Sequence, residues 1–428
     1  MTQLLIQNVR LLEPASMDDR VTDILIDGET IRDIGPSLNT KGADLIDANG
    51  LWAFPGVVDI HAHLREPGQE SKETIATGTR SAAAGGITTV VCMANTAPPV
   101  DSPTAIEFVL ERAERTACVH VHPVGALTKG MQGKEMAPIG AMAEAGAVAI
   151  SDDGCGVMDS YVMMRAMEYA AVFDMPIISH CEDHNLTANA PVNLGKMSTT
   201  LGVTGSPREA ETIQTSRDLI LARKTGAQLH ISHVSAAETV DIIRFYKAKG
   251  VKVTADTAPH YLTLTDEATD HFNTNAKVNP PLRTLEDQEA LYEGLRDGSI
   301  DCIATDHSPH TFSEKDQQMS AAPFGIIGFE TLLPLMLGPI QQRCGLDPIE
   351  ALGWITYKSA RAINLDAGEL KIGGRADLVL WNPDAENVID AETFYSKSRN
   401  TPFNGWKLKG RVKATYVSGR RVHGDSEI

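Results

Sequence analysis

Two short stretches that lie far apart in the chain carry side chains suited to binding a metal ion. The first is Asp59-Ile-His-Ala-His-Leu-Arg65, which follows an apolar run. In a strand, side chains two positions apart point to the same side, so His61 and His63 share one face. The second is Asp306-His-Ser-Pro-His310, which follows another apolar run. Imidazole and carboxylate groups at the ends of two predicted strands indicate a metal-dependent hydrolase.

The elements that must position these residues alternate regularly. Eight apolar runs have strand character: Val57–Ala62, Ile87–Met93, Val119–Gly125, Ala147–Ser151, Pro176–His180, Gln228–His233, Val251–Ala255 and Ile300–Thr305. Helical patterns lie between them, for example Glu73–Ala84, Pro103–Arg115, Tyr161–Phe173, Pro207–Thr225 and Ala236–Lys249. Eightfold alternation of strand and helix predicts an α/β fold with a (β/α)8 barrel of the TIM type over residues 54–368.

The two ends of the chain have a different pattern, in which short strand-like pieces are separated by turn residues. The pieces are Leu25–Glu29 and Ile46–Gly50 near the start, and Ala376–Pro383 and Val412–Arg420 near the end. We therefore expect residues 1–53 and 369–428 to form one small β-sandwich domain that flanks the barrel.

In such a barrel the active site lies at the carboxyl ends of the strands. Candidate ligands follow five of the eight predicted strands: His61 and His63, Asp152 and Asp153, His180, His233, and Asp306. Four imidazoles and two carboxylates suit zinc but are too many for one tetrahedral ion, so two ions about 3.5–4 Å apart are expected. Metal binding lowers the pKa of water to about 7, and Asp306 would act as general base and then general acid. Strand alternation does not decide between Asp152 and Asp153.

Composition limits the classes of partner. The 428 residues carry a formal net charge of −18, which argues against nucleic acid and requires local positive charge for any anionic substrate. No apolar run approaches the roughly 20 residues that span a bilayer, and the start of the chain lacks a signal pattern. The six cysteines form no CxxC pair. They are typical of free thiols, so we expect a cytoplasmic protein.

Specific motifs resemble a known family. Asp59–Gly68 and Ala304–His310 are similar to the two signature segments of the dihydroorotase family, within the amidohydrolase superfamily. The resemblance extends to the ligands after the fourth, fifth and sixth strands and to Ala322–Gly325, so it spans nearly the whole chain. An HxH pair alone is common to the superfamily, whereas HxHLREPG together with TDHxPH is much more specific. Ser308 departs from the pattern, because many members carry alanine there.

The resemblance implies a ligand set for two zinc ions: His61, His63 and Asp306 for one ion, His180 and His233 for the other, and Asp153 as the bridge. The family register thus selects Asp153 over Asp152. Many relatives bridge their metals with a carboxylated lysine, but no lysine occurs here between Lys134 and Lys196. The match is to the dihydroorotase type with an aspartate bridge.

The resemblance also implies which residues hold the dihydroorotate ring and its carboxylate: His63, Arg65, Asn95, Asn279 and His310, with backbone groups at Phe324 and Gly325. Arg65 could pair bidentately with a carboxylate. Two zinc ions, two aspartates, a hydroxide and Arg65 together leave the pocket positive, despite the charge of the whole chain. The segment Thr311–Pro323 is a candidate for a mobile lid.

The function implied is zinc-dependent cyclic amide hydrolysis, interconverting N-carbamoyl-L-aspartate and L-dihydroorotate in pyrimidine biosynthesis. An alternative is allantoinase or hydantoinase, but hydantoins carry no carboxylate for Arg65 to anchor. A second alternative is a non-catalytic partner of aspartate carbamoyltransferase, which need not keep the six ligands present here. We expect a homodimer, and the sequence leaves open whether it assembles with that carbamoyltransferase.

The other histidines are expected to have structural roles. His120 and His122 form a second HxH pair on the third predicted strand, where the family pattern has no ligand. By alternation His230 faces the opposite side from His233 and is expected to pack against a helix. His307 is expected to face away from Asp306.

Overall fold

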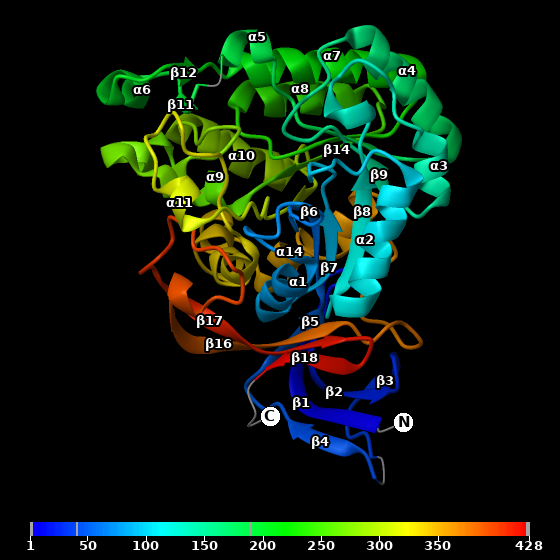
Figure 1. The fold of residues 1–428 in the computed structure, drawn as a ribbon. Helices are drawn as coiled ribbons and strands as arrows, with labels where there is room; N and C mark the ends of the chain where they lie inside the picture. Colours follow the sequence, from blue (N-terminus) through cyan, green and yellow to red (C-terminus); the bar gives the residue numbers. More distant parts are fainter. Residues whose placement is uncertain (1–2, 40–41, 189, 425–428) are drawn as a thin grey trace.

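The computed structural model describes residues 3–39, 42–188 and 190–424, and it has two parts (Figure 1). An α/β barrel occupies the upper part of the view, and a β-sheet that contains both ends of the chain lies below it. The site predicted above belongs to the barrel.

The barrel sheet contains eight strands in chain order: β6 (Val57–Ala62), β7 (Ile87–Cys92), β8 (His120–Gly125), β9 (Ala149–Ile150), β10 (Ile177–Ser179), β13 (Leu229–Ile231), β14 (Val253–Thr257) and β15 (Cys302–Ile303). All neighbours in this order pair in parallel. A parallel bridge between Ala62 and His307 joins the end of β6 to the chain after β15, so the sheet nearly closes. The predicted (β/α)8 barrel is confirmed, although β9 and β15 are shorter than the apolar runs.

Helices follow the strands and surround the barrel (Figure 1). The main ones are α1 (Ile75–Ala84), α2 (Pro103–Thr116), α3 (Ile139–Glu144), α4 (Ser160–Ala170), α7 (Glu209–Thr225), α8 (Ala237–Ala248) and α10 (Leu285–Asp297). Local sequence explains their starts: before α2, the Ser102 hydroxyl accepts the Ala105 N–H, and Pro103 supplies the fixed φ of a first helical position. Ile106, Val109 and Ala113 then form its buried face.

Shorter helices lie in the loops and near the end of the barrel: α5 (His184–Thr187), α6 (Lys196–Leu201), α9 (Pro259–Thr263), α11 (Phe312–Lys315), α12 (Leu332–Leu335), α13 (Gln341–Cys344), α14 (Pro348–Gly353) and α15 (Tyr357–Ala362). No helix in the described part of the chain is both long and apolar enough to cross a membrane. The six cysteines are all free thiols, and four of them are buried.

Apolar side chains fill the interior of the barrel. One buried cluster joins Val58, Ile60, Val91, Ile178 and Cys302 from four of its strands with Ala360 and Ala362 of α15. Burial of these groups holds the strands in place, so the residues that follow the strands are fixed in position at the opposite rim.

The lower sheet combines both ends of the chain. Its order is β18 (Arg420–Gly424), β17 (Lys407–Val417), β16 (Leu378–Val388), β5 (Trp52–Pro55), β1 (Gln3–Glu13), β2 (Asp18–Asp27) and β3 (Thr30–Gly35), and β4 (Asp44–Asp47) also pairs with β1. Its core is mainly aliphatic and includes Ile6, Leu11, Ile24 and Leu378, each 0–1% exposed. The flanking sheet from both termini is confirmed. The domain boundaries at 53/54 and 368/369, and the sandwich arrangement, stay predictions.

Candidate metal centre and substrate pocket

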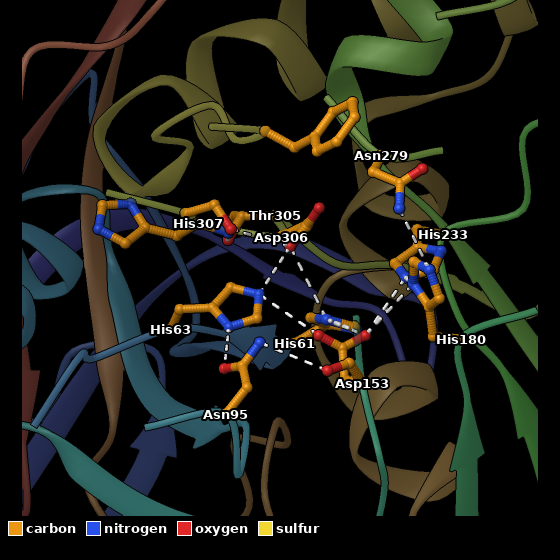
Figure 2. Close-up of polar contacts among 12 residues, drawn as sticks. His61, His63, Asn95, Asp153, His180, His233, Asn279, Thr305, Asp306 and His307 are labelled. Atoms are coloured by element: carbon orange, nitrogen blue, oxygen red, sulfur yellow. Dashed lines mark hydrogen bonds and ion pairs between the residues drawn. The ribbon is translucent and has the colours of Figure 1, made fainter. Parts of the chain in front are cut away.

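The six predicted ligands converge at the carboxyl ends of the barrel strands (Figure 2). His61 lies within β6 and His63 just after it, while Asp153, His180, His233 and Asp306 follow β9, β10, β13 and β15. All six side chains are nearly inaccessible to solvent, with residue exposures of 1–6%. Burying six ionisable groups together is costly unless they are paired or bind a metal.

The two aspartates have different neighbours. Asp153 lies between two pairs of histidines (Figure 2): its Oδ1 is 3.3 Å from His61 Nε2, 3.7 Å from His180 Nδ1 and 3.4 Å from His233 Nε2. Its Oδ2 is 3.7 Å from His63 Nε2. Asp306 contacts one pair only, with Oδ1 3.0 Å from His63 Nε2 and 3.7 Å from His61 Nε2. This arrangement fits a bridging position for Asp153 and a terminal one for Asp306.

Asp152, the neighbour that strand alternation could not separate from Asp153, serves the backbone instead. Its Oδ1 accepts the N–H groups of Leu127 (2.8 Å) and Thr128 (3.0 Å), and its Oδ2 accepts the Thr128 hydroxyl. These hydrogen bonds fix the loop after β8 and occupy both oxygens of Asp152. The carboxylate that faces the metal centre is therefore that of Asp153.

Hydrogen bonds outside the centre orient two of the histidines. His63 Nδ1 lies 2.8 Å from Asn95 Oδ1, and His180 Nε2 lies 3.0 Å from Glu182 Oε2. Both oxygens are acceptors, so the proton of each neutral imidazole lies on the outer nitrogen. The lone pairs of His63 Nε2 and His180 Nδ1 then face the centre, which is the tautomer a metal ligand needs.

The remaining buried nitrogens support the same reading. Both ring nitrogens of His61, and Nδ1 of His233, have no hydrogen-bond partner among the described residues. Although burial disfavours the charged ring, Asp153 and Asp306 raise the pKa of His61 to about 10. A ligating imidazole must be neutral, so a divalent cation would take the place of that proton. Two groups of donors, His61–Asp153–His233 and His61–His63–Asp306, each lie within 4.8 Å of one another. The residues present therefore fit divalent metal ions.

Both carboxylates are ionised at neutral pH. Burial opposes ionisation, but His61, His233 and His63 hold the pKa of Asp153 well below its usual range. For Asp306 the opposing effect of burial is outweighed by His63 and His61, which lower its pKa in the same way. The centre thus offers two anionic oxygens and four imidazoles.

Backbone strain accompanies the site. Arg65, His233 and Asp306 have φ values of +61°, +40° and +49°, in the left-handed region that side chains with a Cβ rarely adopt. Each residue directly follows or closely follows a barrel strand, where the chain turns sharply to present its side chain. Strain of this kind persists only where the surrounding fold imposes it, and it is concentrated at functional sites.

A cavity of about 260 Å³ opens above the centre. It is lined by five of the six candidate ligands and by every residue predicted to contact the substrate: His63, Arg65, Asn95, Asn279, His310, Phe324 and Gly325. Gly325 has φ +145°, and a Cβ there would come within 2.7 Å of Ser308, so a larger residue would push this wall away from the loop after β15.

Arg65 carries the only guanidinium among the residues that line this cavity. The residue is 8% exposed, its Nε donates to the Pro309 carbonyl at 3.2 Å, and burial lowers its pKa to about 10, so it stays charged at neutral pH. His310 Nε2 lies 2.8 Å from the Phe324 carbonyl oxygen and therefore carries the proton. Burial and the charges of Arg65, Lys72 and Lys315 lower the pKa of His310 to about 2, which keeps it neutral. Among the described residues, no carboxylate forms an ion pair with Arg65.

Several residues that support the site were not singled out from the sequence. Glu182 contacts His180 and also accepts Asn279 Nδ2 at 2.8 Å, so it links the metal side of the cavity to the substrate side. Asn400 Nδ2 donates to the carbonyls of Ser308 (2.9 Å) and Gly325 (3.0 Å). Only Glu182 left a sequence signal, because it lies two positions after His180, the same spacing as His61 and His63.

The other histidines have structural contacts. His307 turns away from Asp306 (Figure 2) and stacks on Phe329 with ring centres 3.8 Å apart, as predicted. The helix-packing role expected for His230 is wrong: its ring hydrogen-bonds Thr254 and Asp256 on the neighbouring strand, both at 2.8 Å. His230 is the register partner of Ile178, which belongs to the barrel interior, so its ring lies on the inner face of the sheet beside polar side chains of β14 and not on the face that the helices cover. His120 contacts Asp377, beside the lower sheet.

The barrel and the histidine–aspartate cluster at its rim are those of the amidohydrolase superfamily, whose members are generally metal-dependent. Solved structures agree with this class. L-Hydantoinase (dihydropyrimidinase) from Arthrobacter aurescens matches with a TM-score of 0.90 and 25% identity, covering 100% of this chain and 97% of that one. Dihydropyrimidinase from Brevibacillus agri has the same fold, with a TM-score of 0.86 and 24% identity over 99% and 95% of the two chains.

Sequence comparison identifies the family within this class. A family model described as dihydro-orotase-like matches residues 50–239. Curated relatives named dihydroorotase are 46% identical in Pelotomaculum thermopropionicum, over 100% of both chains, and 46% identical in Ruminiclostridium cellulolyticum, over 98% of both. A relative of the same name in Caldanaerobacter subterraneus is 47% identical over 93% of this chain and 92% of its own. The chain belongs to the dihydroorotase family of cyclic amidohydrolases.

Proposed function

We propose that this enzyme is a zinc-dependent dihydroorotase that interconverts N-carbamoyl-L-aspartate and L-dihydroorotate in cytoplasmic pyrimidine biosynthesis. The name of its relatives and their full-length similarity support the reaction. The observation that carries the substrate is the position of Arg65. A buried guanidinium that has no acidic partner in the described part of the chain lies in the same cavity as the histidine–aspartate cluster.

An unpaired buried charge is costly, so the pocket favours a ligand that brings the opposite charge. A carboxylate can accept two hydrogen bonds from one guanidinium, which makes arginine specific for such ligands. Dihydroorotate carries a carboxylate next to its cyclic amide, whereas hydantoin and allantoin lack one. The geometry therefore favours dihydroorotate over the substrates of the hydantoinase alternative.

The charges of the residues also support bound cations. Without cations, Asp153 and Asp306 are balanced only by Arg65 and a protonated His61, so the residues alone leave no net positive charge to attract an anionic substrate. Two zinc ions would make the pocket positive. We assign one to His61, His63 and Asp306, the other to His180 and His233, and the bridge to Asp153.

When bound, zinc would polarise the ring amide carbonyl and lower the pKa of water. The residues of the chain then have distinct tasks in the reaction. Asp306 accepts the proton of the attacking water and donates it to the ring nitrogen as the C–N bond breaks, and in ring closure the same carboxyl acts in reverse. Arg65, Asn95 and His310 hold the substrate carboxylate.

The ring itself would be held from the other side of the cavity. Asn279 has its Nδ2 engaged by Glu182, which leaves its oxygen to accept a ring N–H. Backbone groups of Phe324 and Gly325 form the facing wall. Polar groups fixed in this way orient the amide for attack without further reorganisation.

The test is to follow L-dihydroorotate by ultraviolet absorbance with the zinc-loaded full-length enzyme, beside hydantoin and allantoin. We expect turnover of dihydroorotate alone, and a rise of about 100-fold in KM for Arg65→Ala, because a lost charge-assisted pair costs about 2–3 kcal/mol. Arg244→Ala, on the outer face of α8, is the matched control and should leave KM unchanged. Preferred turnover of hydantoin, or an unchanged KM in Arg65→Ala, would contradict the assignment.

We also propose that the chain forms a homodimer. Aspartate carbamoyltransferase is the partner to be tested. Light scattering on the purified chain, alone and mixed with that carbamoyltransferase, would measure both. An inactive chain that nevertheless binds the carbamoyltransferase would instead support the non-catalytic alternative.

A further inference from the structure

Two lysines are buried beside the substrate cavity, although neither lines it. Lys277 is 2% exposed and Lys315 is 4% exposed. Lysine is seldom buried without an acidic partner. Within the described residues, neither ammonium group forms an ion pair, so both must be satisfied in another way.

Lys277 binds the backbone of the segment that forms the cavity wall. Its Nζ donates to the carbonyls of Met319 (2.7 Å) and Ala322, and it lies 4.4 Å from the centre of the Phe324 ring. Its own carbonyl accepts the Gly325 N–H at 2.9 Å. One residue thus holds the segment Met319–Gly325 at several points.

Lys315 binds the same segment from a second direction. Its Nζ donates to the carbonyls of Pro323 (3.0 Å) and Gly325 (3.1 Å) and lies 3.4 Å from the Lys277 carbonyl oxygen. The Thr274 hydroxyl holds the carbonyl of Lys315 itself at 2.6 Å. The two side chains therefore direct backbone carbonyls of Met319–Gly325 inward, toward the two lysine nitrogens.

Holding a loop with two buried lysines costs stability, because each charge is removed from water. Burial lowers the pKa of Lys277 to about 8, and burial together with the charge of Lys277 lowers the pKa of Lys315 to about 7. A methionine at either position would fill nearly the same volume without the cost of desolvating a charge. If the two residues had only a structural role, methionine would fill it with a smaller loss of stability. The hydrogen bonds of the ammonium groups therefore indicate a role in function.

The reason lies in what the segment presents to the cavity. Phe324 and Gly325 form one wall, and the Phe324 carbonyl oxygen accepts His310 Nε2, which in turn lies 3.2 Å from Arg65 Nη2. A shift of this wall would therefore move His310 and alter the surroundings of Arg65. Misplacement of binding groups by as little as 1 Å is costly to an enzyme.

We propose that Lys277 and Lys315 form a lysine clamp that fixes Phe324 and Gly325 against the cyclic substrate and so determines the affinity of the pocket for it. Both are positioning residues, since they act through the segment Met319–Gly325. The inference rests on the proposed function for the identity of the substrate. It also divides the predicted lid: the part from Met319 onward is fixed, and only the part around the exposed Phe312 is left to move.

The first test compares Lys277→Met and Lys315→Met with Lys247→Met in the zinc-loaded full-length enzyme. Lys247 Nζ donates to the Gly298 carbonyl at 2.8 Å, just before β15 and so at the opposite end of the barrel. We expect KM for L-dihydroorotate to rise about 10-fold or more in the clamp variants, with kcat reduced much less and zinc content unchanged. Lys247→Met should keep the KM of the parent. An unchanged KM in folded clamp variants would overturn the proposal.

Hydrogen–deuterium exchange provides a readout that does not depend on activity. Loss of either ammonium should speed exchange in the peptide covering Met319–Gly325 and leave peptides of β6 and β7 unaffected. If neither clamp variant folds, the parent protein still decides: its Met319–Gly325 amides should exchange more slowly than those around Phe312, and equal rates would refute the clamp. Absence of dihydroorotase activity in the parent would overturn the proposed function but not this exchange result.

Discussion

The rim of the barrel and the sheet formed by the chain ends differ in the side chains that they bury. At the rim, His61, Asp153, Arg65 and Lys277 are nearly inaccessible although each is ionisable. In the sheet, the core is mainly aliphatic, and Glu13, 5% exposed, lies at the end of β1. Burial of apolar surface stabilises a fold, whereas burial of charge costs stability and is retained for chemistry. The difference teaches that changes at the rim should alter activity, and changes in the sheet should alter stability.

The largest expected effect is a loss of catalysis from a change at the rim of the barrel. Asp306→Asn keeps the shape of the side chain but removes the proton acceptor, so kcat should fall by about 10³–10⁴-fold. The melting temperature should change little. Kinetics with L-dihydroorotate and thermal unfolding of the same sample measure both effects.

Asp152→Asn is the matched control for that variant, because Asp152 binds the backbone at Leu127 and Thr128 rather than the centre. Its kcat should remain within a few-fold of the parent. Equal losses in the two variants would mean that the two aspartates do not differ in the way their contacts indicate.

The second effect breaks the sheet. Leu378→Ala in β16 removes a side chain that is 0% exposed and leaves a cavity, which should lower the free energy of unfolding by about 2–5 kcal/mol. The kcat of the folded protein should stay unchanged, since β16 belongs to the lower sheet and not to the strand ends that carry the site (Figure 1). Urea unfolding and kinetics below the transition measure the two quantities, and a loss of kcat without loss of stability would contradict the comparison.

The third effect concerns the affinity of the rim for zinc. Glu182→Gln weakens the hydrogen bond that orients His180, so zinc affinity should fall by about 10–100-fold. Competition with a chelator measures the affinity, and excess zinc should restore most of the activity. Glu238→Gln on the surface helix α8 is the control. If Glu182→Gln binds zinc like the parent, then the contact between Glu182 and His180 has no influence on the metal.

The smallest effect concerns the sheet and pH. Burial raises the pKa of Glu13 to about 7, although the Leu370 and Ala15 N–H groups oppose the rise. The folded state therefore holds this proton more tightly than the unfolded state, in which the pKa is near its ordinary value. Its contribution to stability is complete at low pH and is lost as the pH rises toward and through 7, by about 1 kcal/mol between pH 6 and 8. Glu13→Gln should remove that part of the pH dependence in urea unfolding. An unchanged slope would show that Glu13 does not titrate in this range.

The comparison also explains what could be predicted from sequence. Each barrel strand was predicted because apolar runs alternate with helical patterns, and His61, His180 and Asp306 were found because they lie at or just after the ends of such runs. Asp153 required the family register, since alternation treats it like Asp152. The order of the lower sheet was not predictable, because its strands come from opposite ends of the chain and pair through contacts that local patterns do not encode.

The supporting residues were missed for a related reason. Lys277 and Asn400 lie in irregular loops and Lys315 ends the four-residue helix α11, so no strand or helix period is long enough to predict the direction of their side chains. Their sequence surroundings are typical of exposed polar loops, and only tertiary packing buries them. His230 shows the limit of periodicity: alternation suggested packing against a helix, but the ring lies on the inner face of the sheet beside a strand carboxylate.

The most direct test of the central claim is a zinc titration of metal-stripped, full-length enzyme, with L-dihydroorotate turnover and bound zinc measured on the same samples. The account predicts negligible turnover without zinc and a rise that levels off at two zinc ions per chain. Full turnover in the metal-stripped protein, or none at any zinc content, would contradict it.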